Sequence, residues 1–157
     1  MILLVGEAYG RTEAQAGEPF VGMAGRYLRG LVSTYASDLE VAYTNICNFW
    51  PKKQGKTRPP SRAEIDKGAE AVYKMIEETR PSMVIGLGQV ALSGLVHHGM
   101  KLEENRGAKR ILSYTSKGGK PGWLAFTVHP SYALRFNRKD LIESDLKLFF
   151  DIERGLK

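Results

Sequence analysis

Short, almost wholly apolar runs alternate with amphipathic stretches along this chain of 157 residues. Residues 2–6 (ILLVG) and 82–88 (SMVIGLG) lack the polar–apolar alternation of a half-exposed strand, which is typical of strands buried on both faces. Residues 41–46 (VAYTNI) supply another strand, and the segments between them repeat apolar residues at helical spacing. This alternation predicts a three-layer α/β/α sandwich with a mainly parallel, four-stranded central sheet.

The segments between the strands carry helix signals. Helices are expected at residues 23–35, from Ser61 to a point before Pro81, at residues 89–96, and from about Arg138 to Glu153. Ser61 and Glu64 form an S-x-x-E capping box, which opens a helix by satisfying its first N–H groups. Residues 110–116 and 123–128 flank a glycine-rich segment, so they can pair as a hairpin or take adjacent places in the sheet.

Composition limits the class of protein. Hydrophobic residues make up 43% and charged residues 25% of the chain, and no repeat or linker divides it, so we expect one folded domain over residues 1–157. The single cysteine, Cys47, excludes an internal disulfide and a metal site built from several thiolates. No apolar run approaches the roughly 18 residues that span a bilayer, so we expect no membrane partner.

Basic residues are concentrated in the expected loops. The net charge is +6, and residues 51–62 (PKKQGKTRPPSR) contain several cations and no acid. Residues 106–110, 116–120 and 134–139 form three further basic patches. One such patch is as well explained by a solvated surface, but four in loops favour a partner with a phosphate backbone.

Chemically capable residues follow or end the predicted strands. Ligands of open α/β sheets bind beyond the carboxyl ends of the strands. Glu7 and Asn45 lie there, His129 ends the last strand, and Phe20 lies in the loop at residues 17–25 (GEPFVGMAG). A flat apolar face, an amide, an imidazole and a carboxylate together suit a planar heterocycle with alternating carbonyl and N–H groups.

Each of these residues also has a purely structural interpretation. Phe20 alone is more often a core residue, and Asn45 could bond a neighbouring turn. His129 before a proline could be a satisfied structural histidine, and Glu7 could cap a helix. Their joint placement favours one pocket.

Four motifs resemble the uracil-DNA glycosylase superfamily, and the family 4 pattern in particular. Residues 6–25 (GEAYGRTEAQAGEPFVGMAG) match its first motif without a gap, and residues 129–135 (HPSYALR) resemble its second active-site motif. Residues 44–51 (TNICNFWP) and 83–92 (MVIGLGQVAL) resemble two of its strands, and residues 145–151 its terminal helix. The resemblance covers nearly the whole chain, and the order of the motifs is more specific than any one of them.

The resemblance implies roles for the pocket residues. Phe20 matches the aromatic residue that stacks on the flipped uracil, Asn45 the amide that reads the pyrimidine edge, and His129 the imidazole that bonds uracil O2. Glu7 matches the acid associated with the attacking water. Backbone N–H groups around Ala8 and Tyr9 are expected to contact the base or its leaving charge. Leu134 is expected to be the apolar wedge that fills the gap in the DNA, and the expected DNA contacts are Lys56, Arg58, Ser131 and Arg135.

The implied activity is hydrolysis of the N-glycosidic bond of deoxyuridine in single- or double-stranded DNA, leaving an abasic site, by a monomer without cofactor or metal. No lysine is placed to form a Schiff base, and residues 51–61 contain no histidine for covalent capture, so simple hydrolysis is expected. The expected location is the cytoplasm of a bacterial or phage-infected cell, at the nucleoid when DNA is bound. A catalytically weak protein that binds uracil or single-stranded DNA is the alternative. A nucleotide-binding or transferase domain is weaker, because the chain lacks G-x-G-x-x-G and a P-loop.

Two departures from the family 4 pattern stand out. Members of that family typically hold an iron–sulfur cluster on four cysteines; here the chain starts too late for the first pair, and the second pair corresponds to Phe49 and Gly68. No cluster is therefore expected, and residues 48–50 (NFW) could fill the space by aromatic packing. The proline of the first motif is Tyr9, which restores a backbone N–H and adds a ring.

Overall fold

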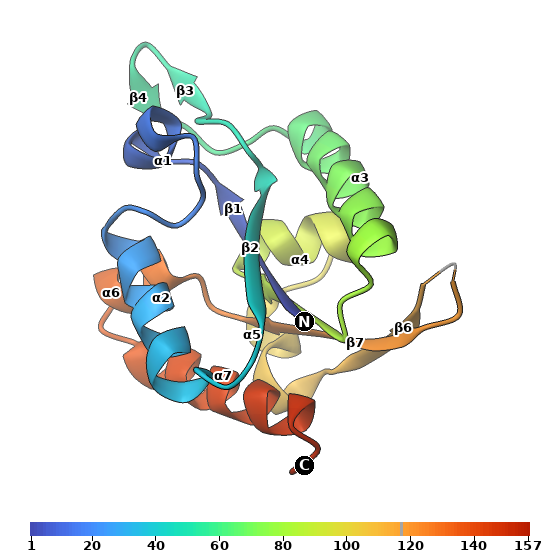
Figure 1. The fold of residues 1–157 in the computed structure, drawn as a ribbon. Helices are drawn as coiled ribbons and strands as arrows, with labels where there is room; N and C mark the ends of the chain where they lie inside the picture. Colours follow the sequence, from blue (N-terminus) through green and yellow to red (C-terminus); the bar gives the residue numbers. More distant parts are fainter. Residues whose placement is uncertain (117) are drawn as a thin grey trace.

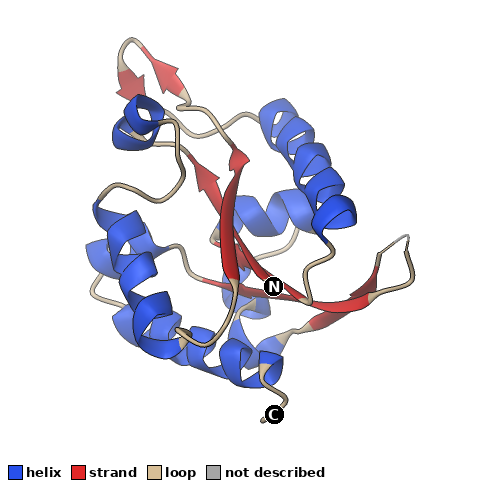
Figure 2. Cartoon of the chain, in the orientation of Figure 1, coloured by secondary structure: helices blue, strands red, loops and turns tan. Residues whose placement is uncertain are grey.

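Five strands form the central sheet of the computed structural model, which describes residues 1–116 and 118–157 (Figures 1 and 2). In spatial order they are β2 (Val41–Cys47), β1 (Ile2–Ala8), β5 (Met83–Leu87), β7 (Pro121–Thr127) and β6 (Leu112–Thr115). The first four are parallel, and β6 is antiparallel to β7. The mainly parallel sheet is confirmed. The expected number of four strands is one too low, because β6 joins the sheet as the hairpin partner of β7.

Helices cover both faces of the sheet, which confirms the three layers (Figure 2). One face carries α2 (Met23–Tyr35), α6 (Pro130–Arg135) and α7 (Lys139–Glu153), and the other carries α3 (Arg62–Thr79) and α4 (Gln89–Leu95). Alternate residues of β1 divide between the two cores: Leu4 packs with the first set and Leu3 with the second. No helix among the described residues is both long and apolar enough to cross a membrane.

Five short elements complete the described chain: α1 (Arg11–Ala16), the hairpin strands β3 (Lys52–Lys53) and β4 (Lys56–Thr57), α5 (Leu102–Asn105) and the 3-10 helix η1 (Gly107–Lys109). Helix α1 and the β3–β4 hairpin project beyond the same end of the sheet (Figure 1). None of these elements was expected from the sequence. They surround the edge where the parallel strands end.

The predicted helix signals are largely confirmed. Ser61 Oγ accepts the Glu64 N–H at the start of α3, and the Glu64 carboxylate accepts the Ser61 N–H in return. The apolar residues at helical spacing in α3 are buried: Ile65, Ala69, Val72 and Ile76. In α2 the apolar residues Leu28, Leu31 and Val32 are buried, but Met23 is 75% exposed, because the first turn of α2 lies at the sheet edge rather than over the core.

Strand register brings the predicted site residues to one edge. Gly6 pairs with Asn45 and Ala8 with Cys47, so the ends of β1 and β2 lie side by side. Leu87 pairs with Thr127, so the residues after β5 and β7 emerge at the same edge. The parallel pairing therefore determines which side chains meet.

Candidate functional site

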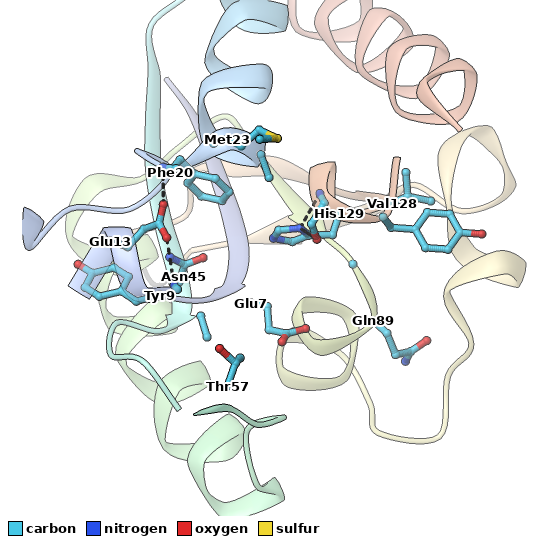
Figure 3. A pocket seen from close by; sticks show the side chains of 18 of the residues that line it. Glu7, Tyr9, Glu13, Phe20, Met23, Asn45, Thr57, Gln89, Val128 and His129 are labelled. Atoms are coloured by element: carbon cyan, nitrogen blue, oxygen red, sulfur yellow. Dashed lines mark hydrogen bonds between the residues drawn. The ribbon is translucent and has the colours of Figure 1, made fainter. Parts of the chain in front are cut away.

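A cavity of about 970 Å³ opens at the carboxyl edge of the sheet (Figure 3). Eight of the site residues predicted from the sequence line it: Glu7, Ala8, Tyr9, Phe20, Asn45, Arg58, His129 and Ser131. Lys56, Leu134 and Arg135 lie outside the lining. Its volume is at the upper end of the range for small-molecule sites, so it has room for a nucleotide and not only for a free base.

Phe20 forms one wall of the cavity and is itself only 5% exposed. Its ring lies between those of Tyr43, at a centroid distance of 5.9 Å, and His129, at 6.2 Å. Its backbone has φ 57°, in the left-handed region that non-glycine residues rarely adopt. Gly25 permits this path, because a Cβ there would lie 2.2 Å from the Phe20 carbonyl carbon.

Asn45 lies deeper, near the end of β2, and is 2% exposed. Within the described structure its Oδ1 is buried without a hydrogen-bond donor. An unsatisfied buried acceptor costs free energy that a ligand can recover by donating an N–H. Gly6 makes room for this amide, because a Cβ at that position would lie 2.4 Å from Oδ1.

His129 caps the N-terminus of α6 with its ring. Nδ1 accepts the Ser131 backbone N–H at 3.1 Å, and the Ser131 hydroxyl lies 2.7 Å from the same nitrogen. A backbone N–H can only donate, so Nδ1 carries no proton and the neutral ring holds its proton on Nε2. Burial lowers the pKa of His129 to about 4, although the Glu13 carboxylate opposes this shift. The imidazole is therefore neutral at pH 7, with Nε2–H as its donor.

Glu7, the last residue but one of β1, lines the cavity on the side of Thr57 (Figure 3). Burial raises the pKa of its carboxyl group above the ordinary value. A carboxylate with a raised pKa is a stronger base once ionised, which suits it to accept a proton from water near neutral pH.

Tyr9 and Ala8 line the cavity beside Glu7. The Tyr9 N–H donates to the carbonyls of Cys47, at 3.3 Å, and Phe49, at 3.1 Å. The expected contact of this N–H with a base would require it to leave both acceptors. Its visible function is to tie the end of β1 to the chain leaving β2.

The residues expected to contact DNA differ in their exposure and in their partners. Arg58 forms a two-pronged ion pair with Glu64, at 2.7 and 3.1 Å, and so braces the β3–β4 hairpin against α3. Lys56 is exposed on that hairpin, and the Arg135 guanidinium lies 5.6 Å from the Phe136 ring. Leu134 is half-buried.

An exposed aromatic pair lies next to Leu134. Tyr132 lines the cavity and is 42% exposed, and its ring lies 4.9 Å from that of Phe136. Tyr132 therefore presents more apolar surface at the cavity than Leu134 does. The sequence could have indicated this residue, because Tyr132 lies only three residues after His129 in the H-P-S-Y motif.

Other lining residues were also missed. Met23 and Lys109 line the cavity, the latter with Nζ donating to the Glu103 carbonyl. Gln89 ties the start of α4 to the first residue of α5 by accepting the Leu102 N–H at 2.9 Å. Glu13 bonds three backbone N–H groups of the loops that enclose the cavity. These are contacts between segments, and the local pattern of the sequence does not encode them.

The iron–sulfur cluster of the family 4 pattern does not fit the residues present. Residues 1–157 contain one cysteine, and a Cβ at Gly68 would lie 1.9 Å from the carbonyl oxygen of Ile46. Phe49 is 42% exposed, so the idea that aromatic packing fills the space is wrong for this ring. Cys47 is buried among apolar residues, which raises its pKa to about 11. No group of three metal-ligating side chains occurs among the described residues.

An aromatic wall, an unsatisfied buried amide oxygen and a neutral imidazole donor meet in one pocket at the end of a mainly parallel sheet, and this arrangement is suited to a planar heterocycle. Residues 1–151 match the family model described as the uracil DNA glycosylase superfamily, and the chain belongs to this superfamily. The resemblance seen in the motifs is thereby confirmed.

The chain is similar to proteins named type-4 uracil-DNA glycosylase. It is 30% identical to that of Thermotoga maritima over 159 residues, which is 98% of this chain and 75% of the relative. It is 29% identical to that of Pyrobaculum aerophilum over 152 residues, 95% of this chain and 76% of the relative. With that of Archaeoglobus fulgidus the identity is 35% over 91 residues, 57% of this chain but only 44% of the relative.

Proposed function

We propose that this protein hydrolyses the N-glycosidic bond of deoxyuridine in DNA, releasing uracil and leaving an abasic site for base-excision repair. The observation that carries this proposal is the convergence of Phe20, Asn45, His129 and Glu7 on one cavity. The relatives named as uracil-DNA glycosylases support the choice of substrate.

The base would be held by three of these residues. Phe20 stacks on the ring, and the unsatisfied Asn45 Oδ1 accepts the ring N–H between the two carbonyls. His129 donates Nε2–H to a carbonyl oxygen. Adenine, guanine and cytosine do not present this carbonyl–N–H–carbonyl edge, so the set distinguishes uracil from these three bases.

The bond between C1′ of the sugar and N1 of the base breaks, and its electron pair leaves with the uracil. A neutral donor at His129 stabilises the charge that develops on the carbonyl oxygen without transferring a proton. Water attacks C1′ and loses its proton to the Glu7 carboxylate, whose raised pKa makes it a competent acceptor. The uracil anion then takes a proton from solvent, so one water is consumed for each base released.

The target nucleotide must leave the base stack to enter the cavity. Arg11 and Lys109 line the cavity and supply positive charge for the backbone phosphates, whereas Arg106 and Arg138 are paired with Asp145 and Asp140. We propose a monomer acting in the cytoplasm and located at the nucleoid when DNA is bound. A positively charged chain suits that partner.

The test uses end-labelled single-stranded and duplex oligonucleotides, each with one uracil, incubated with the protein and then treated with alkali. We expect cleavage that depends on alkali and is lost in Asn45→Ala and His129→Ala. His98→Ala is the matched control, because His98 pairs with Asp66 outside the cavity and should retain activity.

No cleavage, together with retained binding of uracil-DNA in a gel shift, would overturn the enzyme proposal and favour a protein that only binds. Cleavage without alkali would instead indicate a lyase step.

A further inference from the structure

The loop that presents Phe20 is strained and is held from both sides by charged side chains. Phe20 is at φ 57°, a conformation that persists only when its surroundings over-determine it. Its ring contributes to the cavity wall, so a small rotation of this backbone would move the stacking surface. The groups that fix the adjacent peptides therefore control the geometry of base binding.

Glu13 holds the N–H groups of the loop. Its Oε2 accepts from Val21 at 3.0 Å and from Gly22 at 2.6 Å, and its Oε1 accepts from Gly10 at 3.1 Å. Burial by itself would raise the pKa of Glu13, but these backbone donors outweigh burial and lower it, so the group is ionised. One carboxylate thus bonds the segment after β1 to the segment after Phe20.

Arg29 holds the carbonyl groups of the same loop. Its Nε donates to the Phe20 carbonyl at 2.8 Å and its Nη2 to the Pro19 carbonyl at 3.0 Å. Its guanidinium also lies 4.2 Å from the centre of the Tyr43 ring, and the centre of that ring lies 5.9 Å from the centre of the Phe20 ring. Arg29 therefore fixes both the main chain and the support of the stacking ring.

We propose that Glu13 and Arg29 are positioning residues for base recognition: together they clamp the peptide groups on both sides of Phe20 and so set its ring against the base. The inference rests on the proposed function. It assigns the two residues no contact with the base: both position Phe20, and the Glu13 carboxylate also acts electrostatically on His129, an effect that Arg29 does not share.

The chain offers conservative variants for both residues. Glu13→Gln keeps the size of the side chain, but its NH₂ group replaces one acceptor and must face at least one of the three N–H donors. Arg29→Lys keeps the charge but loses the planar fork that serves two carbonyls and the Tyr43 ring at once. Glu18→Gln and Arg26→Lys are the matched controls, since both are exposed on the same loop and helix.

The deciding experiment is a double-mutant cycle with Phe20→Ala. For each variant we would measure KM and kcat on the single-uracil oligonucleotide and the binding of radiolabelled free uracil by equilibrium dialysis. Displacing the ring by about 1 Å should weaken uracil binding and lower kcat/KM on the order of 10- to 100-fold. The affinity for the same oligonucleotide with thymine should stay unchanged, because the phosphate contacts remain.

In the Phe20→Ala background the same changes should have little further effect, because the clamp then has no ring to position. Equal losses in both backgrounds, or wild-type uracil affinity in Glu13→Gln and Arg29→Lys, would overturn the clamp. If Glu13→Gln lowers the Tm by more than about 10 °C, its loss of activity could reflect unfolding, and the double-mutant cycle of Arg29→Lys with Phe20→Ala then decides whether the clamp exists. A wild-type protein that binds free uracil without cleaving DNA would refute the proposed function, and dialysis would still test the clamp.

Discussion

Gly6→Ala is the sharpest test of the pocket, because one methyl group would enter the space between the two residues expected to hold the base. The added Cβ would lie 2.4 Å from Asn45 Oδ1 and 2.5 Å from Phe20 Cζ, about 1 Å inside normal contact for each. Gly6 lies in a strand without positive φ, so the substitution strains the side chains and not the backbone.

Relieving both contacts requires Phe20 or Asn45 to move by about 1 Å, a displacement that can cost about 100-fold in rate. Overpacking of this kind destabilises a core by about 1–3 kcal/mol, which lowers the Tm of a chain this long by about 2–12 °C. We therefore expect a folded protein at 25 °C with kcat/KM on uracil-DNA reduced about 100-fold.

The assay is alkali-dependent cleavage of a single-uracil oligonucleotide, with thermal unfolding measured in parallel. Gly30→Ala in α2 is the control, because a Cβ there meets nothing within 4 Å and should stabilise the helix by about 0.5–1 kcal/mol. If Gly6→Ala keeps activity within about threefold of wild type, Phe20 and Asn45 do not hold the base as proposed.

Three further predictions concern pH, the wedge and the missing cluster. The Glu7 carboxyl, with its raised pKa, loses its charge as the pH falls through that pKa, so kcat/KM should fall on an acid limb above pH 4.5, and Glu7→Gln should remove this limb. Burial lowers the pKa of His129 to about 4, so a limb near pH 6.5 that persists in Glu7→Gln would contradict the neutral state of His129. Tyr132→Ala should weaken binding of single-stranded uracil-DNA about 10-fold and Leu134→Ala less, measured by fluorescence anisotropy; the reverse order would restore Leu134 as the wedge. Gly68→Cys should lower the Tm by several degrees, because its Cβ would collide with a backbone carbonyl of β2; an unchanged Tm would show that α3 can move away.

The sequence predicted the sheet and the long helices because their signals are local. Continuous apolar runs indicate buried parallel strands, and the Ser61–Glu64 capping box indicates where α3 begins. Helix α1 escaped prediction because it has six residues and no buried side chain, well below the length at which a helix is stable alone. Glu13 ties this helix to the following loop by accepting N–H groups from residues eight and nine positions later in the chain. Hydrophobic periodicity in the sequence does not reveal such contacts.

Phe20 shows the same limit in another form. The sequence placed Phe20 in a loop rich in glycine, and in the structure its backbone has φ 57°. The sequence offered its ring as a flat apolar face of the pocket, whereas the structure packs the ring against Tyr43 and His129 and leaves it as a wall of the cavity. Which faces of a ring are covered depends on three segments distant in the chain, so only the assembled fold decides it.

The residues at the cluster positions help to explain how the ends of β1 and β2 hold together without a cluster. Gly68 lets α3 approach the Ile46 carbonyl more closely than any side chain would allow. Tyr9, unlike the proline it replaces, donates an N–H to the chain after β2, and a backbone hydrogen bond of this kind is worth about 1 kcal/mol. The Arg58–Glu64 pair contributes less, because both side chains are partly exposed and screened by salt. Close backbone packing and the Tyr9 N–H, rather than surface charge, are therefore what fixes the strand end that carries Asn45.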